Sequence, residues 1–198
     1  MVLTPNETSS GVQIPHAYLE QGWNARGKDT LLAWDTTSCA GGRILPANAY
    51  DVQVFSLQKC FGAAGGTSVL VLSPQAVERI EEAKKYRTVP YTLDLAYVVE
   101  TARKFQTFNT PNTINIWLCY EACKWMLAHG GLQAMDKLCQ EHAEYLFTWA
   151  EKTDWVRPYV ADKNLRSYTT PTFEITDPAI SAGDINAALA ATGKPNLA

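Results

Sequence analysis

The sequence lacks long apolar runs and dense basic blocks. No segment approaches the roughly 20 consecutive apolar residues that cross a bilayer, and Met1–Pro5 has neither the basic start nor the apolar stretch of an export signal. The 17 Lys and Arg residues are outnumbered by 20 Asp and Glu, which gives a formal charge of -3. Nucleic acid, a membrane surface and a membrane-embedded state are therefore not expected for this protein.

Paired cysteines and linkers are also missing. The five cysteines, at positions 39, 60, 119, 123 and 139, do not have the spacing of a zinc site or a small disulfide scaffold. No metal site is predicted, and a reducing cytoplasm fits this cysteine usage best. A chain of 198 residues that is 46% hydrophobic, with no repeats and no Pro/Gly/Ser-rich linker, predicts one domain plus part of a second.

Short apolar strand patterns alternate with helical ones, which predicts an α/β fold with a mainly parallel sheet. A helix starting at Pro74 should be capped by Ser73, and a last helix, through Ala191, should be capped by Ser181. In the helix over 132–149 an apolar face at helical spacing is predicted, formed by Leu132, Met135, Leu138, Cys139, His142, Leu146 and Trp149. The predicted strands are Leu31–Trp34, Val52–Ser56, Ser68–Leu72 and Thr172–Ile175. The helix from Pro74 is predicted to end near Tyr86, and one further helix is predicted over Thr113–His129.

The periodicity weakens over residues 154–172, where we place a domain boundary. Residues 1–153 are predicted to form one domain and residues 154–198 part of a second, smaller α+β domain.

Two residues at the ends of predicted strands carry the chemical signal. Lys59 follows the strand 52–56, and Asp35 follows the strand 31–34. Pyridoxal phosphate chemistry needs a lysine amine for a Schiff base with the cofactor aldehyde, and a carboxylate that keeps the ring nitrogen protonated. The carboxyl ends of sheet strands are where open α/β folds bind ligands. The pair therefore indicates a site for this cofactor.

Each residue also has a structural interpretation. Lys59 could be a surface lysine in a turn, and Asp35 could cap a helix or a turn, as could Thr36, Thr37 and Ser38. A charge directly after four apolar residues is costly to bury without a cationic partner, which favours the cofactor interpretation of Asp35.

Several segments together resemble the phosphoserine aminotransferases, which are class V, fold-type I pyridoxal phosphate enzymes. The Lys59 segment SLQKCFG is similar to their S-x-Q-K-C-F-[GA] motif, and the Asp35 segment DTTS is similar to D-A-T-S. Further matches, in family order over essentially the whole chain, are N-E-T-S-S-G-V at 6–12, F-N-T-P-N-T at 108–113, G-G-L at 130–132 and Arg166-Ser167.

The resemblance implies a role for each matched residue. Lys59 would form the Schiff base and act as the catalytic base, and Asp35 would pair with the pyridine nitrogen. Thr8 would bind near the phenolic oxygen, and Gln58 would help to hold the phosphate. Asn109 and Thr110 would reach the cofactor phosphate of a neighbouring subunit, which implies a homodimer with shared active sites. The implied reaction is cytoplasmic transamination between glutamate and 3-phosphohydroxypyruvate, a step of serine biosynthesis.

The resemblance starts in the middle of the family's large domain and stops before the end of its small domain. We therefore expect this chain alone to lack groups that cradle the cofactor phosphate and bind the substrate, and to turn over poorly unless a second polypeptide supplies them. Two other hypotheses stay open. One is another class V enzyme, such as an alanine–glyoxylate aminotransferase or a cysteine desulfurase relative, and the other is a non-catalytic interaction protein or fragment of the same fold.

Overall fold

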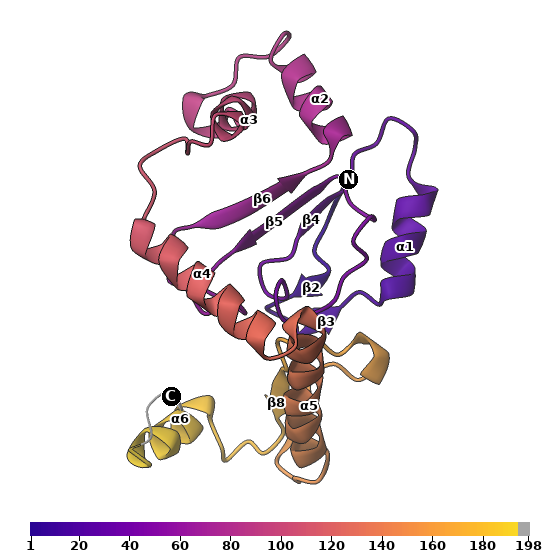
Figure 1. Cartoon of the computed structure of the whole chain (residues 1–198). Helices are drawn as coiled ribbons and strands as arrows, with labels where there is room; N and C mark the ends of the chain where they lie inside the picture. Colours follow the sequence, from indigo (N-terminus) through magenta and orange to yellow (C-terminus); the bar gives the residue numbers. More distant parts are fainter. Residues whose placement is uncertain (194–198) are drawn as a thin grey trace.

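The computed structural model describes residues 1–193 and contains a four-stranded central sheet (Figure 1). Its strand order is β1-β4-β5-β6, in which β1–β4 and β4–β5 are parallel and β5–β6 is antiparallel. This confirms the predicted α/β fold with a mainly parallel sheet. The four strands are β1 (Val2–Leu3), β4 (Ala33–Asp35), β5 (Val52–Ser56) and β6 (Ser68–Leu72).

Two antiparallel hairpins stand outside this sheet. One pairs β2 (Asn6–Glu7) with β3 (Val12–Gln13), and the other pairs β7 (Val156–Pro158) with β8 (Phe173–Ile175). The β7–β8 hairpin packs on α5. The domain boundary predicted near residue 154 falls in the turn between α5 and β7, and it stays a prediction.

The helices surround the sheet (Figure 1): α1 lies beside its β1–β4 side, and α2 and α3 lie beyond β6. None of the helices in residues 1–193 combines the length and the apolar character that a membrane span requires. Two short 3-10 turns, at Tyr91–Leu93 and Lys163–Leu165, complete the secondary structure. The helices are α1 (His16–Ala25), α2 (Pro74–Ala83), α3 (Leu95–Arg103), α4 (Thr113–Ala128), α5 (Gly131–Glu151) and α6 (Ala182–Ala191).

The predicted caps are confirmed. Ser73 Oγ accepts a hydrogen bond from the Ala76 amide at 3.1 Å, which satisfies one of the free donors at the start of α2. Ser181 and Asp184 form a reciprocal capping box at the start of α6. The α2 helix ends at Ala83, three residues before the predicted end. The sequence patterns did not reveal α1, α3 or the two-residue strands.

The core of the main sheet consists of Leu19 from α1 together with Leu32, Trp34 and Ala49, all almost fully buried. Burial of a large apolar side chain contributes roughly 1.5–3 kcal/mol, so this cluster fixes α1 against β4. Trp34 also packs on Tyr50, with ring centroids 5.1 Å apart. Because β4 is held from this side, the position of its carboxyl end is well determined.

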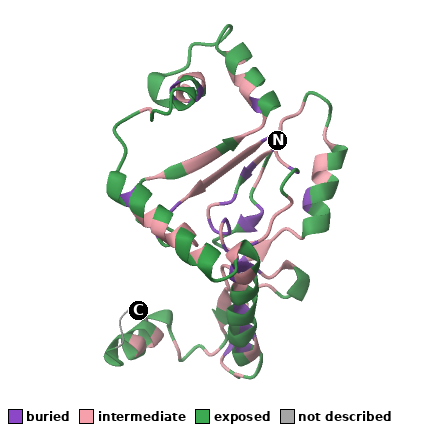
Figure 2. Cartoon of the chain, viewed as in Figure 1, coloured by how far each residue is buried: buried purple, intermediate pink, exposed green. Residues whose placement is uncertain are grey.

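The predicted apolar face of α5 is buried only in part: Met135 is buried and Cys139 is half-buried, but the other members are exposed. The described structure buries Met135, Asp136, Ala143, Phe147 and Ala150, and His142 is exposed. Apolar side chains on the adjacent face of the helix remain 37–43% exposed, namely Leu132, Leu138, Leu146 and Trp149. Apolar side chains cover two adjacent faces of this helix. The buried face is the one that packs against the β7–β8 hairpin, and Figure 2 shows buried positions along α5.

Candidate functional site

Asp35 is the last residue of β4, one residue beyond the predicted end of this strand, and it begins the turn at the carboxyl edge of the sheet. The Asp35 side chain is exposed rather than buried, and its Oδ1 accepts a hydrogen bond from the Thr37 amide at 3.0 Å. The expectation that Asp35 is buried is therefore wrong, and its interpretation as a turn aspartate is confirmed. Thr36 is buried and fixes this turn to β5, since its amide donates to the Val54 carbonyl at 2.9 Å and its Oγ1 accepts from Gln53 at 2.9 Å.

The turn after β5 carries Gln58 and Lys59, and both side chains are exposed. The Lys59 carbonyl accepts a hydrogen bond from the Gly62 amide at 2.9 Å, which closes the turn. Gly62 has a φ of +64°, a conformation that glycine adopts without the strain of a side chain. Phe61 stacks on Phe55 of β5 at a centroid distance of 5.3 Å, so the turn is anchored to its own strand.

The two turns pack on each other. Cys60 Sγ lies 4.0 Å from the Ser38 carbonyl oxygen, and a Cβ built on Gly42 would lie only 2.9 Å from that sulfur. Similarly, a Cβ on Gly41 would lie 3.1 Å from the Phe61 ring. The glycines therefore allow a close approach of backbone to side chain. Asp35 and Lys59, 24 positions apart in sequence, thus project from neighbouring turns at one edge of the sheet.

Asn6 is a residue of this region that the sequence reasoning missed. It is 1% exposed, and its side-chain amide donates to Ser38 Oγ at 2.9 Å while Ser38 Oγ donates to the Asn6 carbonyl, also at 2.9 Å. Thr8 follows two residues later as an exposed residue of the β2–β3 turn. The Asn6 contacts therefore bring the Thr8 turn to the Asp35 turn. Asn6 is the first residue of the motif at 6–12, but no local spacing in the sequence indicates a hydrogen bond across 32 residues.

Asn109 and Thr110 belong to a different segment from these turns. They lie exposed in the loop between α3 and α4, where the Asn109 carbonyl accepts a hydrogen bond from Thr107 at 2.6 Å. Among residues 1–193, no hydrogen bond or ion pair joins either of them to Lys59, Asp35 or Thr8. The start of α4, directly after this loop, contacts the loop beyond Lys59, because Asn115 donates a hydrogen bond to the Gly65 carbonyl at 3.5 Å.

The thiols around the site are held in their neutral form. Burial raises the pKa of Cys60 from 9.0 to about 11, with the neighbouring Cys139 adding to the effect. Burial likewise raises the pKa of Cys39 to about 12. Because the thiolate is the nucleophile, these cysteines are unreactive near neutral pH. Lys59 is therefore the better candidate for covalent chemistry at this edge of the sheet.

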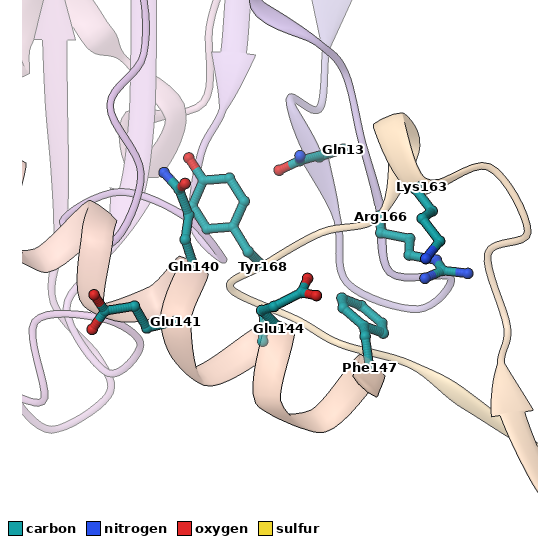
Figure 3. A pocket seen from close by; sticks show the side chains of 9 residues that line it. Gln13, Gln140, Glu141, Glu144, Phe147, Lys163, Arg166 and Tyr168 are labelled. Atoms are coloured by element: carbon teal, nitrogen blue, oxygen red, sulfur yellow. The ribbon is translucent and has the colours of Figure 1, made fainter. Parts of the chain in front are cut away.

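A hollow of about 550 Å³ lies elsewhere, between α5 and the segment 163–168 (Figure 3). Arg166 and Lys163 lie side by side at its rim, and both bind the Glu151 carboxylate, at 2.7 and 2.9 Å. These ion pairs depress the pKa of Glu151. None of the predicted cofactor-binding residues lines this hollow, whose walls are Gln13, Gln140, Glu141, Ala143, Glu144, Phe147, Lys163, Arg166 and Tyr168.

Comparison with known proteins identifies the family. The sequence profile of the family described as Aminotransferase class-V matches residues 1–193. The chain belongs to this family. The chain is 36% identical over 189 residues to the phosphoserine aminotransferase of Nocardioides sp., covering 95% of this chain and 50% of that protein. The phosphoserine aminotransferase of Corynebacterium glutamicum is also 36% identical over 189 residues, with 95% and 49% covered.

Solved structures agree with this assignment. The phosphoserine aminotransferase of Cytophaga hutchinsonii superimposes with a TM-score of 0.86 at 31% identity, covering 96% of this chain and 52% of that one. An aspartate aminotransferase of Thermus thermophilus gives a TM-score of 0.81 at 19% identity, covering 97% of this chain and 52% of that one, which shows a shared fold alone. The fold is thus the fold-type I arrangement of class V aminotransferases. The chain spans about half the length of the relatives that it matches.

Proposed function

We propose that this protein binds pyridoxal 5'-phosphate at the carboxyl edge of β4 and β5, and takes part in transamination between glutamate and 3-phosphohydroxypyruvate. The observation that carries the proposal is the packing of the Asp35 turn on the Lys59 turn, through Cys60 and Gly42. Support for the substrate comes from relatives named phosphoserine aminotransferase at 36% identity, and for the cofactor from a neighbour of the same fold that was solved with it bound. The reaction belongs to serine biosynthesis.

The side chains at this edge fit the functional groups of the cofactor. An exposed lysine amine suits an aldehyde, and an exposed carboxylate suits a ring nitrogen that must stay protonated. When bound, the cofactor supplies an electron sink for the substrate carbanion. The Thr8 hydroxyl and the Gln58 amide are short, neutral hydrogen-bonding groups suited to the phenolic oxygen and the phosphate.

Each residue then has a definite role. Lys59 Nζ would be the group that holds the cofactor aldehyde, and its amine would serve as the general base for the proton on the substrate α-carbon. The Asp35 carboxylate holds a proton on the ring nitrogen, because an adjacent anion favours the cationic form of that group. Both roles require the two side chains to face one site from neighbouring turns.

We also propose that two copies share their active sites. Asn109 and Thr110 are exposed in the loop between α3 and α4, which suits a role at the cofactor phosphate of a partner subunit. The protein is proposed to act in the cytoplasm, in keeping with five free cysteines in the described structure.

A cofactor titration tests the proposal. Mixing the chain with pyridoxal phosphate should produce a new absorbance band near the edge of the visible range, and the Lys59→Ala variant should not produce it. The matched control is Lys137→Ala, which removes a 78% exposed lysine on α5 and should behave as the unaltered protein. Borohydride reduction followed by peptide mass analysis should locate the adduct on Lys59. A band of equal strength in the Lys59→Ala variant would contradict the assignment.

A second assay separates cofactor binding from amino transfer. With cofactor and glutamate present, the chain should release 2-oxoglutarate, and the Asp35→Ala variant should lose this activity by a larger factor than it loses cofactor affinity. The reason is that protonation of the ring nitrogen matters to the carbanion, whereas the covalent link through Lys59 survives. Cofactor binding without any release of 2-oxoglutarate would support the non-catalytic alternative.

A further inference from the structure

We propose that Asn6 is a positioning residue, which sets the spacing between the turn that carries Asp35 and the turn that carries Thr8. Asn6 itself is buried, at 1% exposure, so it acts through the segments that it joins. The inference rests on the proposed function, since the two turns matter because of the cofactor that they would hold.

The side-chain amide of Asn6 connects three segments. Its Nδ2 donates to Ser38 Oγ at 2.9 Å and to Thr170 Oγ1 at 3.2 Å. Its Oδ1 accepts from Ser167 Oγ at 2.5 Å and from Thr169 Oγ1 at 3.4 Å. Both donors and both acceptor positions of the amide are thus used. The joined segments are the end of the Asp35 turn, the start of the Thr8 turn, and residues 167–170 between β7 and β8.

The hydroxyl partners are themselves fixed. Ser167 Oγ accepts hydrogen bonds from the amides of Thr169 and Thr170, at 3.2 and 2.9 Å, and the Ser167 amide donates to the Gly11 carbonyl at 2.8 Å. Ser167 is fully buried. A buried network in which each group is satisfied is rigid, and loss of one member leaves the others unpaired at a cost. Asn6 therefore fixes the distance between the Asp35 turn and the Thr8 turn and also stabilises the fold.

Two members of the Asn6 network are only two or three residues in sequence from Thr8 and Asp35. Ser38 lies three residues after Asp35, whose carboxylate is bonded to the Thr37 amide within the same turn. Thr8 lies two residues after Asn6. A shift of the Asn6–Ser38 contact would therefore move both candidate groups relative to Lys59, whose turn is anchored to β5 by the stacking of Phe61 on Phe55.

The test compares Asn6→Ala and Ser38→Ala with Asp51→Asn in the full chain. Asp51 is also buried and accepts hydrogen bonds from Leu32 and Ser73, but it precedes β5 and lies at the opposite edge of the sheet. All three variants should lose thermal stability. Only Asn6→Ala and Ser38→Ala should weaken pyridoxal phosphate binding, by about tenfold, and shift the wavelength of the Lys59-dependent band, because only they move Asp35.

Thr170→Val covers the case in which Asn6→Ala fails to fold. It removes one hydrogen-bond partner of Asn6 with little change of shape and should weaken binding severalfold. If Asn6→Ala, Ser38→Ala and Thr170→Val keep the affinity and spectrum of the unaltered protein, or change them no more than Asp51→Asn does, the positioning role is refuted. That result leaves the proposed function in place, whereas absence of a Lys59-dependent band from the unaltered protein overturns both.

Discussion

Substitution of Gly11 by alanine tests how the β2–β3 turn packs against the segment 167–172. Gly11 lies in the β2–β3 turn with a φ of +70°, and its carbonyl accepts a hydrogen bond from the Ser167 amide. A Cβ added there would collide with the Thr172 hydroxyl and would lie 2.8 Å from the Thr170 carbonyl oxygen. Gly62 provides the matched control, because its φ is +64° and nothing lies within 4 Å of the added Cβ.

The two substitutions separate backbone strain from steric overlap. The left-handed conformation costs an alanine roughly 1–2 kcal/mol, which is all that Gly62→Ala should lose in free energy of unfolding. Overpacking adds about 1–3 kcal/mol, so Gly11→Ala should lose roughly 2–5 kcal/mol. Adding Thr172→Ala to Gly11→Ala should recover only part of this loss, because the backbone oxygen of Thr170 remains in the way.

Urea unfolding followed by circular dichroism measures these free energies for the four proteins. Equal losses for Gly11→Ala and Gly62→Ala would show that the segment 167–172 does not lie against the β2–β3 turn. Full recovery in the double variant would instead show that the Thr170 carbonyl is farther away than described. Either result would also remove the basis for placing Asn6 against Ser167.

Two further predictions concern buried polar groups. Asp51→Asn should lower the free energy of unfolding by about 3 kcal/mol. The reason is that the Leu32 amide and the Ser73 hydroxyl lose a charged acceptor at a residue that is 2% exposed. A thermal unfolding curve measures this loss. For Cys60, the folded pKa of about 11 lies above the ordinary value of 9.0, so the unfolded chain releases the thiol proton first as pH rises. The contribution of Cys60 to the free energy of unfolding should be constant below about pH 9 and should decline toward pH 11. Over this range the free energy of unfolding should fall less steeply with pH in Cys60→Ser than in the unaltered protein. An equal pH dependence in the two proteins would mean that the thiol is not buried.

The local features of the fold were predictable from sequence, and the reasons are physical. The strands Val52–Ser56 and Ser68–Leu72 were predicted with the bounds that the structure gives, because their apolar runs end in polar or glycine turns. The starts of α2 and α6 were predicted from Ser73 and Ser181, because a cap acts within three residues of its own position. By contrast, α1 begins after Pro15 without any side-chain cap, and its buried Leu19 is explained only by the distant Leu32 and Trp34.

The candidate site likewise contains residues that the sequence predicted and one that it did not. Lys59 and Asp35 were found because each follows an apolar strand, and parallel pairing of those strands was enough to predict a shared edge. Asn6 carries no such signal, since its partners are Ser38 and a segment more than 160 residues away. A buried amide with four hydroxyl partners can be recognised only after the chain has folded.

The exposure of Asp35 also changes how its chemistry is argued. From sequence, a charge after four apolar residues seemed to need a cationic partner to offset burial. In the structure, Asp35 is the last residue of β4 and its side chain is exposed, and the Thr37 amide donates to Oδ1 alone. The turn interaction and a ring-nitrogen interaction are then compatible, because an ionised carboxylate has two oxygens and about four acceptor positions. The Thr37 bond orients the carboxylate, while the buried Thr36 fixes the backbone beneath it. The case for Asp35 therefore depends on a turn held in place by β5, and no longer on the cost of burying a charge.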